Sequence, residues 1–197
     1  MSLLTPMLRS SPLTDWFSDA QRVQGMLDFE AALAQAQAAC GMVPTAAVGP
    51  IVAACRHEAI DFTALGEAAV GAGNLAIPLV KQLTAQVKAR DPDAARYVHW
   101  GATSQDAIDT GLVLQLRGAL EAAETLLEQL LAALAGQADR YRDTVMPGRT
   151  WMQHALPVTF GLKLAGTLDA LLRWQQRLRE MRPRLLVLQF GGAAGTL

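Results

Sequence analysis

QDAIDTGLVLQLRGALEAAETLLEQLLAALAGQADRY, residues 105–141, is the longest regularly patterned run in this chain of 197 residues. Its apolar side chains recur at steps of three and four, the period of one face of an α-helix. These side chains belong to Ile108, Leu112, Leu116, Leu120, Ala123, Leu127, Leu130 and Leu134. At about 1.5 Å per residue, the helix is roughly 50 Å long and exceeds the width of a compact domain of this size. It can bury its stripe only against other long helices, from this chain or from partner chains, so we expect a mainly α-helical fold.

The pattern predicts further helices on both sides of this run. Residues 19–39 form an amphipathic helix that begins after the N-cap Ser18 and ends at Gly41. Its inward face comprises Val23, Met26, Leu27, Glu30, Ala31, Leu33 and Ala34. A shorter helix is expected to open at Pro44 and to carry Ile51, Val52 and Cys55. The other expected helices cover residues 61–69, 78–87 and 158–181, and residues 184–190 are the one expected strand.

Composition narrows the class of protein. Lys and Arg number 17 against 18 Asp and Glu, so the net charge of −1 gives no basic surface for nucleic acid. With 51% hydrophobic residues the chain is expected to fold rather than stay disordered. The start, Met1–Pro6, lacks a signal-peptide pattern and no apolar run is long enough to span a membrane, which predicts a cytoplasmic protein. Cys40 and Cys55 are expected to be free, buried thiols.

A first polar cluster lies where a loop opens the long helix. Residues 98–110, VHWGATSQDAIDT, carry His99, Thr103 and Ser104. A helix start has unpaired N–H groups and partial positive charge, which suits a carboxylate or phosphate. The same hydroxyls can simply cap the helix, His99 can be a core histidine, and Asp106 can serve only the helix dipole.

A second polar cluster, GRTWMQH at residues 148–154, precedes the helix expected at 158–181. Arg149 is a fork donor for carboxylates, Thr150 and Gln153 are further hydrogen-bonding groups, and His154 is the best proton carrier of the chain. Trp151 and Met152 are expected to be packing residues, and His154 can also be structural. We interpret the two clusters as halves of one site.

Other kinds of chemistry find no support in the sequence. The three histidines are far apart, no Cys pair accompanies them, and no glycine-rich phosphate loop or nucleophile elbow is present. We therefore expect no metal and no cofactor. What remains is proton chemistry on a small carboxylic acid.

The residues of both clusters resemble a known group of enzymes. HWGATSQD at residues 99–106 is similar to the first signature of the fumarase/aspartase superfamily, and GRTWMQHA at 148–155 to its second. Residues 24–34, 73–78 and 182–192 resemble more narrowly the bacterial 3-carboxy-cis,cis-muconate cycloisomerases, or lactonizing enzymes.

This resemblance implies an architecture and an activity. The fold would combine a small N-terminal helical domain, residues 1–104, with the first long helices of a central bundle, residues 105–197. The protein would be a homotetramer with active sites shared between subunits. It would convert a small tricarboxylate, 3-carboxy-cis,cis-muconate, to 4-carboxymuconolactone without a cofactor.

Roles for individual residues follow from the matching positions. His154 would be the proton donor or charge-relay group. The substrate-binding residues would be His99, Thr103, Ser104, Arg149, Thr150, Gln153, Asn74 and Arg22.

The third signature of the superfamily, a Gly-Ser-Ser loop continuing into Met-Pro-x-Lys-x-Asn, is absent from the sequence. The resemblance thus implies an N-terminal portion of a longer enzyme, inactive by itself. An alternative is adenylosuccinate lyase or another fumarate-releasing lyase, although Gly73-Asn74 stands where an adenylosuccinate lyase would have a His-Asp pair. An alternative of another class is a non-catalytic helical assembly module whose polar clusters are caps.

Overall fold

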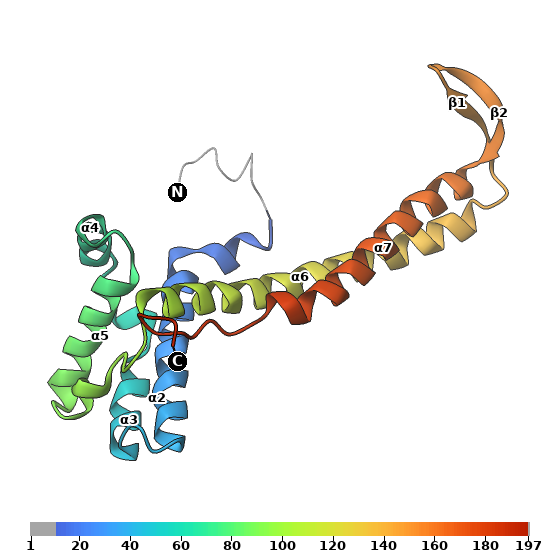
Figure 1. Cartoon of the computed structure of the whole chain (residues 1–197). Helices are drawn as coiled ribbons and strands as arrows, with labels where there is room; N and C mark the ends of the chain where they lie inside the picture. Colours follow the sequence, from blue (N-terminus) through green and yellow to red (C-terminus); the bar gives the residue numbers. More distant parts are fainter. Residues whose placement is uncertain (1–10, 197) are drawn as a thin grey trace. The chain divides into compact units, whose positions relative to one another are not determined.

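The computed structural model describes residues 11–196, and helices dominate it (Figure 1). The stretch compared with signal peptides, Met1–Pro6, lies outside these residues. The α-helices are α2 (Asp19–Ala39), α3 (Thr45–Ala54), α4 (Phe62–Ala72), α5 (Ala76–Arg90), α6 (Ser104–Arg140) and α7 (Phe160–Leu185). Short 3-10 turns are η1 (Thr14–Phe17), η2 (His57–Ala59) and η3 (Ala94–Tyr97), and the strands are β1 (Val145–Thr150) and β2 (Gln153–Thr159).

The chain divides into two compact units. Unit 1 comprises Met1–Ala119 and Leu186–Leu197, and unit 2 comprises Leu120–Leu185. The boundary falls inside α6, whereas the division expected from the sequence, after residue 104, coincides with the first residue of that helix. No helix in the described part of the chain is long and apolar enough to cross a membrane.

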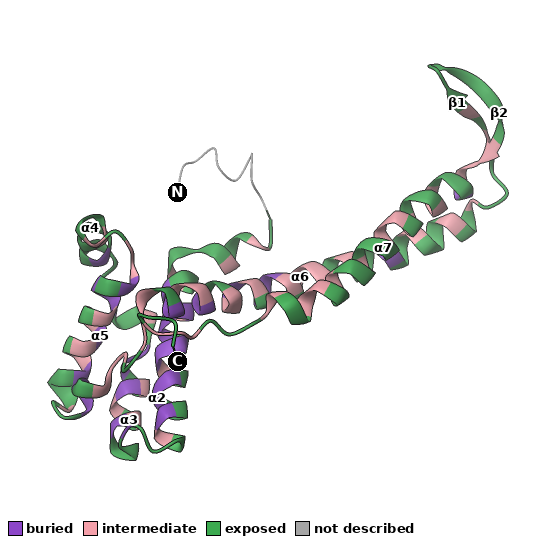
Figure 2. Cartoon of the chain, in the orientation of Figure 1, coloured by how far each residue is buried: buried purple, intermediate pink, exposed green. Residues whose placement is uncertain are grey.

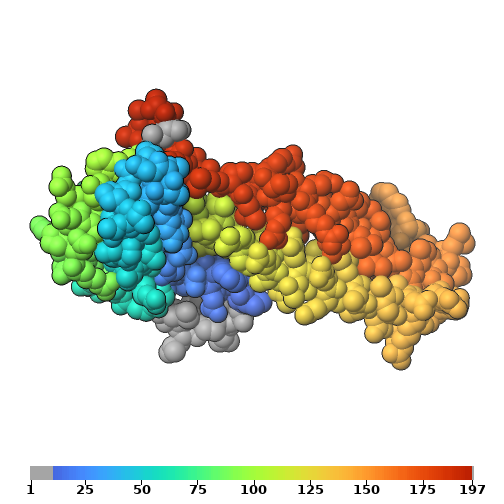
Figure 3. Space-filling view, turned by 90° about the horizontal axis from the view of Figure 1, so that it is seen from below, coloured from blue at the N-terminus to red at the C-terminus, as the bar shows by residue number. Residues whose placement is uncertain are grey.

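The core of unit 1 is built around α2. Figure 2 shows buried residues concentrated on α2, α3, α5 and the start of α6, and α2, α3 and α5 lie side by side in Figure 3. Leu27 and Leu83 are fully buried, and each such side chain contributes about 1.5–3 kcal/mol relative to exposure. Where α2 meets α6, glycine faces glycine: a Cβ on Gly25 would lie 2.7 Å from the Gly111 carbonyl oxygen. The two backbones can approach this closely because neither residue has a side chain.

The expected helices are confirmed: the one opening at Pro44 is α3, and those at residues 61–69, 78–87 and 158–181 are α4, α5 and α7. Residues 19–39 form α2, where the Ser18 hydroxyl accepts a hydrogen bond from the Gln21 N–H at 3.3 Å and Gly41 has a positive φ of 72°. The run at residues 105–141 forms α6 almost to the residue. Cys55 is buried as expected, but the expectation for Cys40 was wrong, because its thiol lies in the exposed turn after α2.

The strand expected at residues 184–190 is wrong. Helix α7 continues through Pro183 to Leu185, and irregular backbone follows. The backbone N–H and C=O groups of a strand form hydrogen bonds with a neighbouring strand. Here side chains of α6 form hydrogen bonds with this segment instead. The Gln189 N–H donates to the Thr110 hydroxyl at 3.1 Å, and the same hydroxyl donates to the Gln189 carbonyl at 2.9 Å.

In unit 2, the last part of α6 and α7 lie side by side (Figures 1 and 3). Arg182 joins them through hydrogen-bonded ion pairs with Glu124 at 2.8 Å and Glu121 at 3.0 Å. Apolar side chains of both helices nevertheless stay exposed, among them Leu126, Leu130, Leu162, Leu172 and Trp174. The long stripe read from the sequence is therefore only partly covered within unit 2.

Residues 145–159 form an antiparallel hairpin instead of the loop and helix start expected there. The turn residues Trp151 and Met152 have positive φ angles of 47° and 60°, whereas such two-residue turns favour Asn-Gly. The strands contain Pro147 and Pro157, and Gly148 sits in a bulge where a Cβ would lie 2.6 Å from the Leu156 carbonyl oxygen. Neither the turn nor the strands thus carry the usual sequence signals of a hairpin.

Candidate functional site

The first polar cluster is a tight loop held open by left-handed backbone. His99 has a φ of 58° and Gly101 one of 73°. A non-glycine residue in this region is uncommon, and such strain is found disproportionately at functional sites. The loop places His99, Thr103 and Ser104 within six residues at the start of α6.

Helix α2 forms hydrogen bonds with this loop through two buried side chains that were not predicted as site residues. The Glu30 carboxylate lies 2.5 Å from Nδ1 of His99, and the Gln37 amide donates to the Trp100 carbonyl at 2.7 Å. Glu30 and Gln37 are 2% and 5% exposed. The signal that could have revealed Glu30 is a carboxylate on the inward, apolar face of α2, because a buried charge requires a partner.

Asp106 does more than complement the helix dipole, so that interpretation was wrong. Its side chain is fully buried and accepts hydrogen bonds from the N–H groups of Gly191 at 2.9 Å, Gly192 at 3.0 Å and Thr103 at 2.9 Å. Burial raises the pKa of this carboxyl, but the three backbone donors, aided by the Gln189 side chain, outweigh burial and lower it below its ordinary value. Asp106 thus ties the segment after α7 to the start of α6.

Thr103 and Ser104 stand immediately before and at the first residue of α6, and both are half-buried. The Asp106 carboxylate receives the Thr103 N–H, as the acidic residue of a capping box does. Asp106 thereby satisfies the N–H of Thr103, the residue before the first helical residue, and supplies the acidic half of a capping box.

Arg22 and Asn74 meet at a separate cavity of unit 1. This cavity, of about 390 Å³, is lined by Arg22, Met26, Asn74, Leu75, Ile108, Leu112 and Gln115. The Asn74 side-chain oxygen accepts the Ile77 N–H at 3.1 Å and so fixes the start of α5. Ile108, which lines this cavity, lies about one turn after Ser104 on α6, whereas His99, Thr103 and Ser104 are not among the lining residues.

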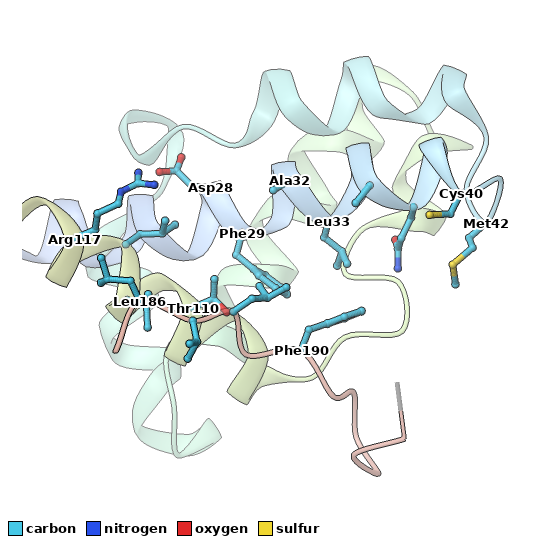
Figure 4. A pocket seen from close by; sticks show the side chains of 16 residues that line it. Asp28, Phe29, Ala32, Leu33, Cys40, Met42, Thr110, Arg117, Leu186 and Phe190 are labelled. Carbon is cyan, nitrogen blue, oxygen red and sulfur yellow. The ribbon is translucent and has the colours of Figure 1, made fainter. Parts of the chain in front are cut away.

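A larger groove, about 500 Å³, lies between α2, α6 and residues 186–190 (Figure 4). Phe29, Leu33, Leu186 and Phe190 make its walls apolar, and no histidine is among its lining residues in the described part of the chain. Because it offers no proton carrier of that kind, the polar clusters are the better candidates for the chemistry.

The second polar cluster lies at the tip of the hairpin in unit 2. The register pairs Arg149 with His154 and Thr150 with Gln153. Directly opposed residues share a face and successive residues alternate, so the two pairs face opposite sides of the hairpin. All four side chains are exposed in this chain.

The prediction that Trp151 and Met152 are packing residues is wrong for this chain, because both lie exposed at the tip of the hairpin. Trp151 is 93% and Met152 106% exposed, because the turn projects them away from both strands. Figure 2 shows the hairpin exposed along most of its length.

The predicted site residues therefore fall into three groups. His99, Thr103 and Ser104 share a loop and helix start in unit 1, while Arg22 and Asn74 share a cavity in the same unit. Arg149, Thr150, Gln153 and His154 share the hairpin of unit 2. The first group offers donors for a carboxylate. The third combines a guanidinium with an imidazole that can transfer a proton.

Comparison with known proteins gives consistent matches. The lyase family model matches residues 8–197. A 3-carboxy-cis,cis-muconate cycloisomerase of Pseudomonas aeruginosa is 64% identical over 95% of this chain and 41% of its own length. The 3-carboxy-cis,cis-muconate lactonizing enzyme of Pseudomonas putida superposes with a TM-score of 0.95 at 57% identity, over 98% of this chain and 44% of that one. A fumarate lyase of Mesorhizobium sp. BNC1 superposes with a TM-score of 0.88 at 43% identity, over 93% of this chain and 43% of that one. The chain thus spans about two-fifths of the length of these relatives.

Proposed function

Because this chain belongs to the lyase family and has a fumarase/aspartase-like, mainly α-helical fold, we propose that the protein to which it contributes is a 3-carboxy-cis,cis-muconate cycloisomerase. The reaction closes 3-carboxy-cis,cis-muconate to 4-carboxymuconolactone without a cofactor. The observation that carries this proposal is the 64% identity with a cycloisomerase over nearly the whole chain. That match includes the segments that form both polar clusters.

The chemistry requires a proton and several anion holders. One substrate carboxylate oxygen forms a bond to a carbon of the C=C bond, and the π electrons move into the conjugated carboxylate to give an enediolate-like species. A general acid then protonates the adjacent carbon. Each fixed donor aimed at the developing charge is worth a few kcal/mol, roughly 2.7–4 in well-studied oxyanion holes.

The hairpin supports the assignment of the proton to His154. Its register places Arg149 directly opposite, so a cation that can hold a carboxylate lies beside the imidazole that delivers the proton. Thr150 and Gln153, on the other face, are assigned to a different carboxylate or to the segment that supports the hairpin. In unit 1, His99, Thr103 and Ser104 bind a further carboxylate, with Arg22 and Asn74 as outer contacts.

We assign the site to a homotetramer in which subunits share their clusters. This assignment is supported by the apolar side chains that α6 and α7 leave exposed in unit 2 and by a hairpin tip that exposes Trp151 and Met152. Large exposed apolar patches mark protein–protein contacts. The whole protein in this proposal is a cytoplasmic enzyme that acts on a small tricarboxylate.

The proposal can be tested with a chimera. This chain replaces the matching two-fifths of the Pseudomonas aeruginosa relative, and the purified chimera is mixed with 3-carboxy-cis,cis-muconate. We expect the ultraviolet absorbance of the conjugated diene to disappear at a rate comparable to that of the parent enzyme. The parent enzyme is the positive control.

The same assay decides between the alternatives. A chimera that leaves 3-carboxy-cis,cis-muconate intact but cleaves adenylosuccinate would replace the proposal with a fumarate-releasing lyase, the activity named for the Mesorhizobium neighbour. A folded chimera that assembles but turns over neither compound would favour a helical assembly module.

A further inference from the structure

Glu30 is a buried carboxylate that none of the assigned roles uses. It lies on α2, is 2% exposed, and contacts Nδ1 of His99 at 2.5 Å through Oε1. Its second oxygen, Oε2, is buried without a hydrogen-bond partner among the described residues. Burying a carboxylate with one oxygen unpaired costs stability, so a purely structural loop anchor would be better served by a neutral group.

The contact is made against a constrained imidazole. The His99 backbone is held at a φ of 58°, and the next residue is fixed by the Gln37 amide on the Trp100 carbonyl. Glu30 and Gln37 lie seven residues apart on one helix, two turns along the same face. Gln37 holds the loop backbone, whereas Glu30 contacts the ring.

We propose that Glu30 is a positioning residue that accepts the Nδ1–H of His99 and thereby fixes the tautomer of this histidine. The inference rests on the proposed function, in which His99 binds a substrate carboxylate. With Nδ1 committed to Glu30, Nε2 becomes the ring atom available to the ligand. A neutral ring then presents Nε2 as an acceptor, so His99 binds a carboxylate once Nε2 has taken up a proton and donates it in a hydrogen bond, while Glu30 accepts the N–H at Nδ1.

Nitrogen NMR of the imidazole rings in the 197-residue chain tests this assignment. The chain has three histidines, so single substitutions of His57 and His154 assign the signals of His99. In the wild-type chain, the neutral form of the ring should carry its proton on Nδ1 and none on Nε2. A neutral His99 that carries its proton on Nε2 would overturn the proposal without any variant.

Matched variants separate positioning from fastening of the loop. Glu30→Leu removes the acceptor that holds the proton on Nδ1, so the proton of the neutral ring should return to Nε2. Glu30→Gln keeps an acceptor oxygen and should retain Nδ1–H. Gln37→Leu, which releases the loop backbone but leaves the ring contact, should retain it too. A His99 tautomer that is the same in wild type and folded Glu30→Leu, or that changes equally in Gln37→Leu, would contradict a specific role of Glu30.

The outcome is independent of turnover. A Nδ1-protonated His99 in a chain whose chimera is inactive would leave the positioning contact standing and remove the proposed activity. An active chimera whose His99 is Nε2-protonated would do the reverse.

Discussion

Replacing Asp106 with Asn should destabilise unit 1 by an amount that follows from its contacts. Oδ1 accepts the Gly191 N–H, and Oδ2 accepts the N–H groups of Gly192 and Thr103. An asparagine retains one acceptor oxygen, so its best orientation keeps the pair on Oδ2 and turns an NH2 group toward Gly191. A hydrogen bond to a charged group is worth about 1.5–3 kcal/mol, and the retained pair loses its charge, so we expect a loss of about 2–4 kcal/mol.

Urea unfolding and amide hydrogen exchange together measure this loss. The midpoint of unfolding should fall, and the Gly191 and Gly192 amides should exchange faster, since they lose the carboxylate that holds them. The matched control is Asp109→Asn, one turn along the same helix, where the carboxylate accepts a hydrogen bond from the exposed Gln105 side chain at 2.7 Å and from no other group in residues 11–196. This control should change stability by less than about 0.5 kcal/mol.

The effect of Asp106 should also depend on pH in a definite direction. Its folded-state pKa lies below the ordinary value of 3.8, so its stabilisation is present above that pH and disappears as the pH falls through the folded pKa. The stability difference between wild type and Asp106→Asn should therefore be full near neutrality and shrink below pH 3.8. Equal stability of the two proteins at neutral pH, or a difference that grows on acidification, would refute the reasoning.

Three further results are expected. Gly111→Ala should lower the free energy of unfolding by about 1–3 kcal/mol, because its Cβ would lie 2.9 Å from the Met26 backbone nitrogen. The control Gly136→Ala, on the same helix, meets no atom within 4 Å and should be neutral or stabilising. Equal effects of the two substitutions on thermal unfolding would contradict the close approach of α2 and α6. Disulfide-exchange labelling should modify the exposed Cys40 quickly and the buried Cys55 only on unfolding. Burial, with the charges of Glu30 and Asp28, raises the pKa of the Cys55 thiol to about 12, so little reactive thiolate forms in the folded chain. Labelling of both thiols at one rate would contradict this packing. The 197-residue chain alone should not convert 3-carboxy-cis,cis-muconate, and turnover by it would show that the third signature is dispensable.

The helices could be predicted because their signals are local. The 3.6-residue period of α6 and the cap at Ser18 are written in consecutive residues, so their limits fall within a residue or two of the prediction. The hairpin at residues 145–159 was not predicted, because Trp151 and Met152 in its turn adopt a backbone conformation that usually requires glycine or asparagine. The strand assigned to residues 184–190 failed because an apolar run does not reveal whether a strand or a helix side chain receives its hydrogen bonds.

The site was predictable as a set of residue types but not as a network. His99 could be singled out from its signature, whereas its partner Glu30 lies 69 positions away, and only the fold brings them together. Asp106 shows the same limit, since its three donors include Gly191 and Gly192, more than 80 residues later. The role of a buried carboxylate depends on such distant donors.

The rate of lactone formation by the chimera and by its His154→Ala variant tests the central claim most directly. His154 is exposed on the hairpin, so its replacement should leave the helical content and unfolding midpoint unchanged. A general acid contributes roughly 10²–10⁴-fold, and we expect kcat to fall by that factor. An active chimera whose kcat is unaffected by His154→Ala would contradict the assignment of the hairpin as the source of the proton.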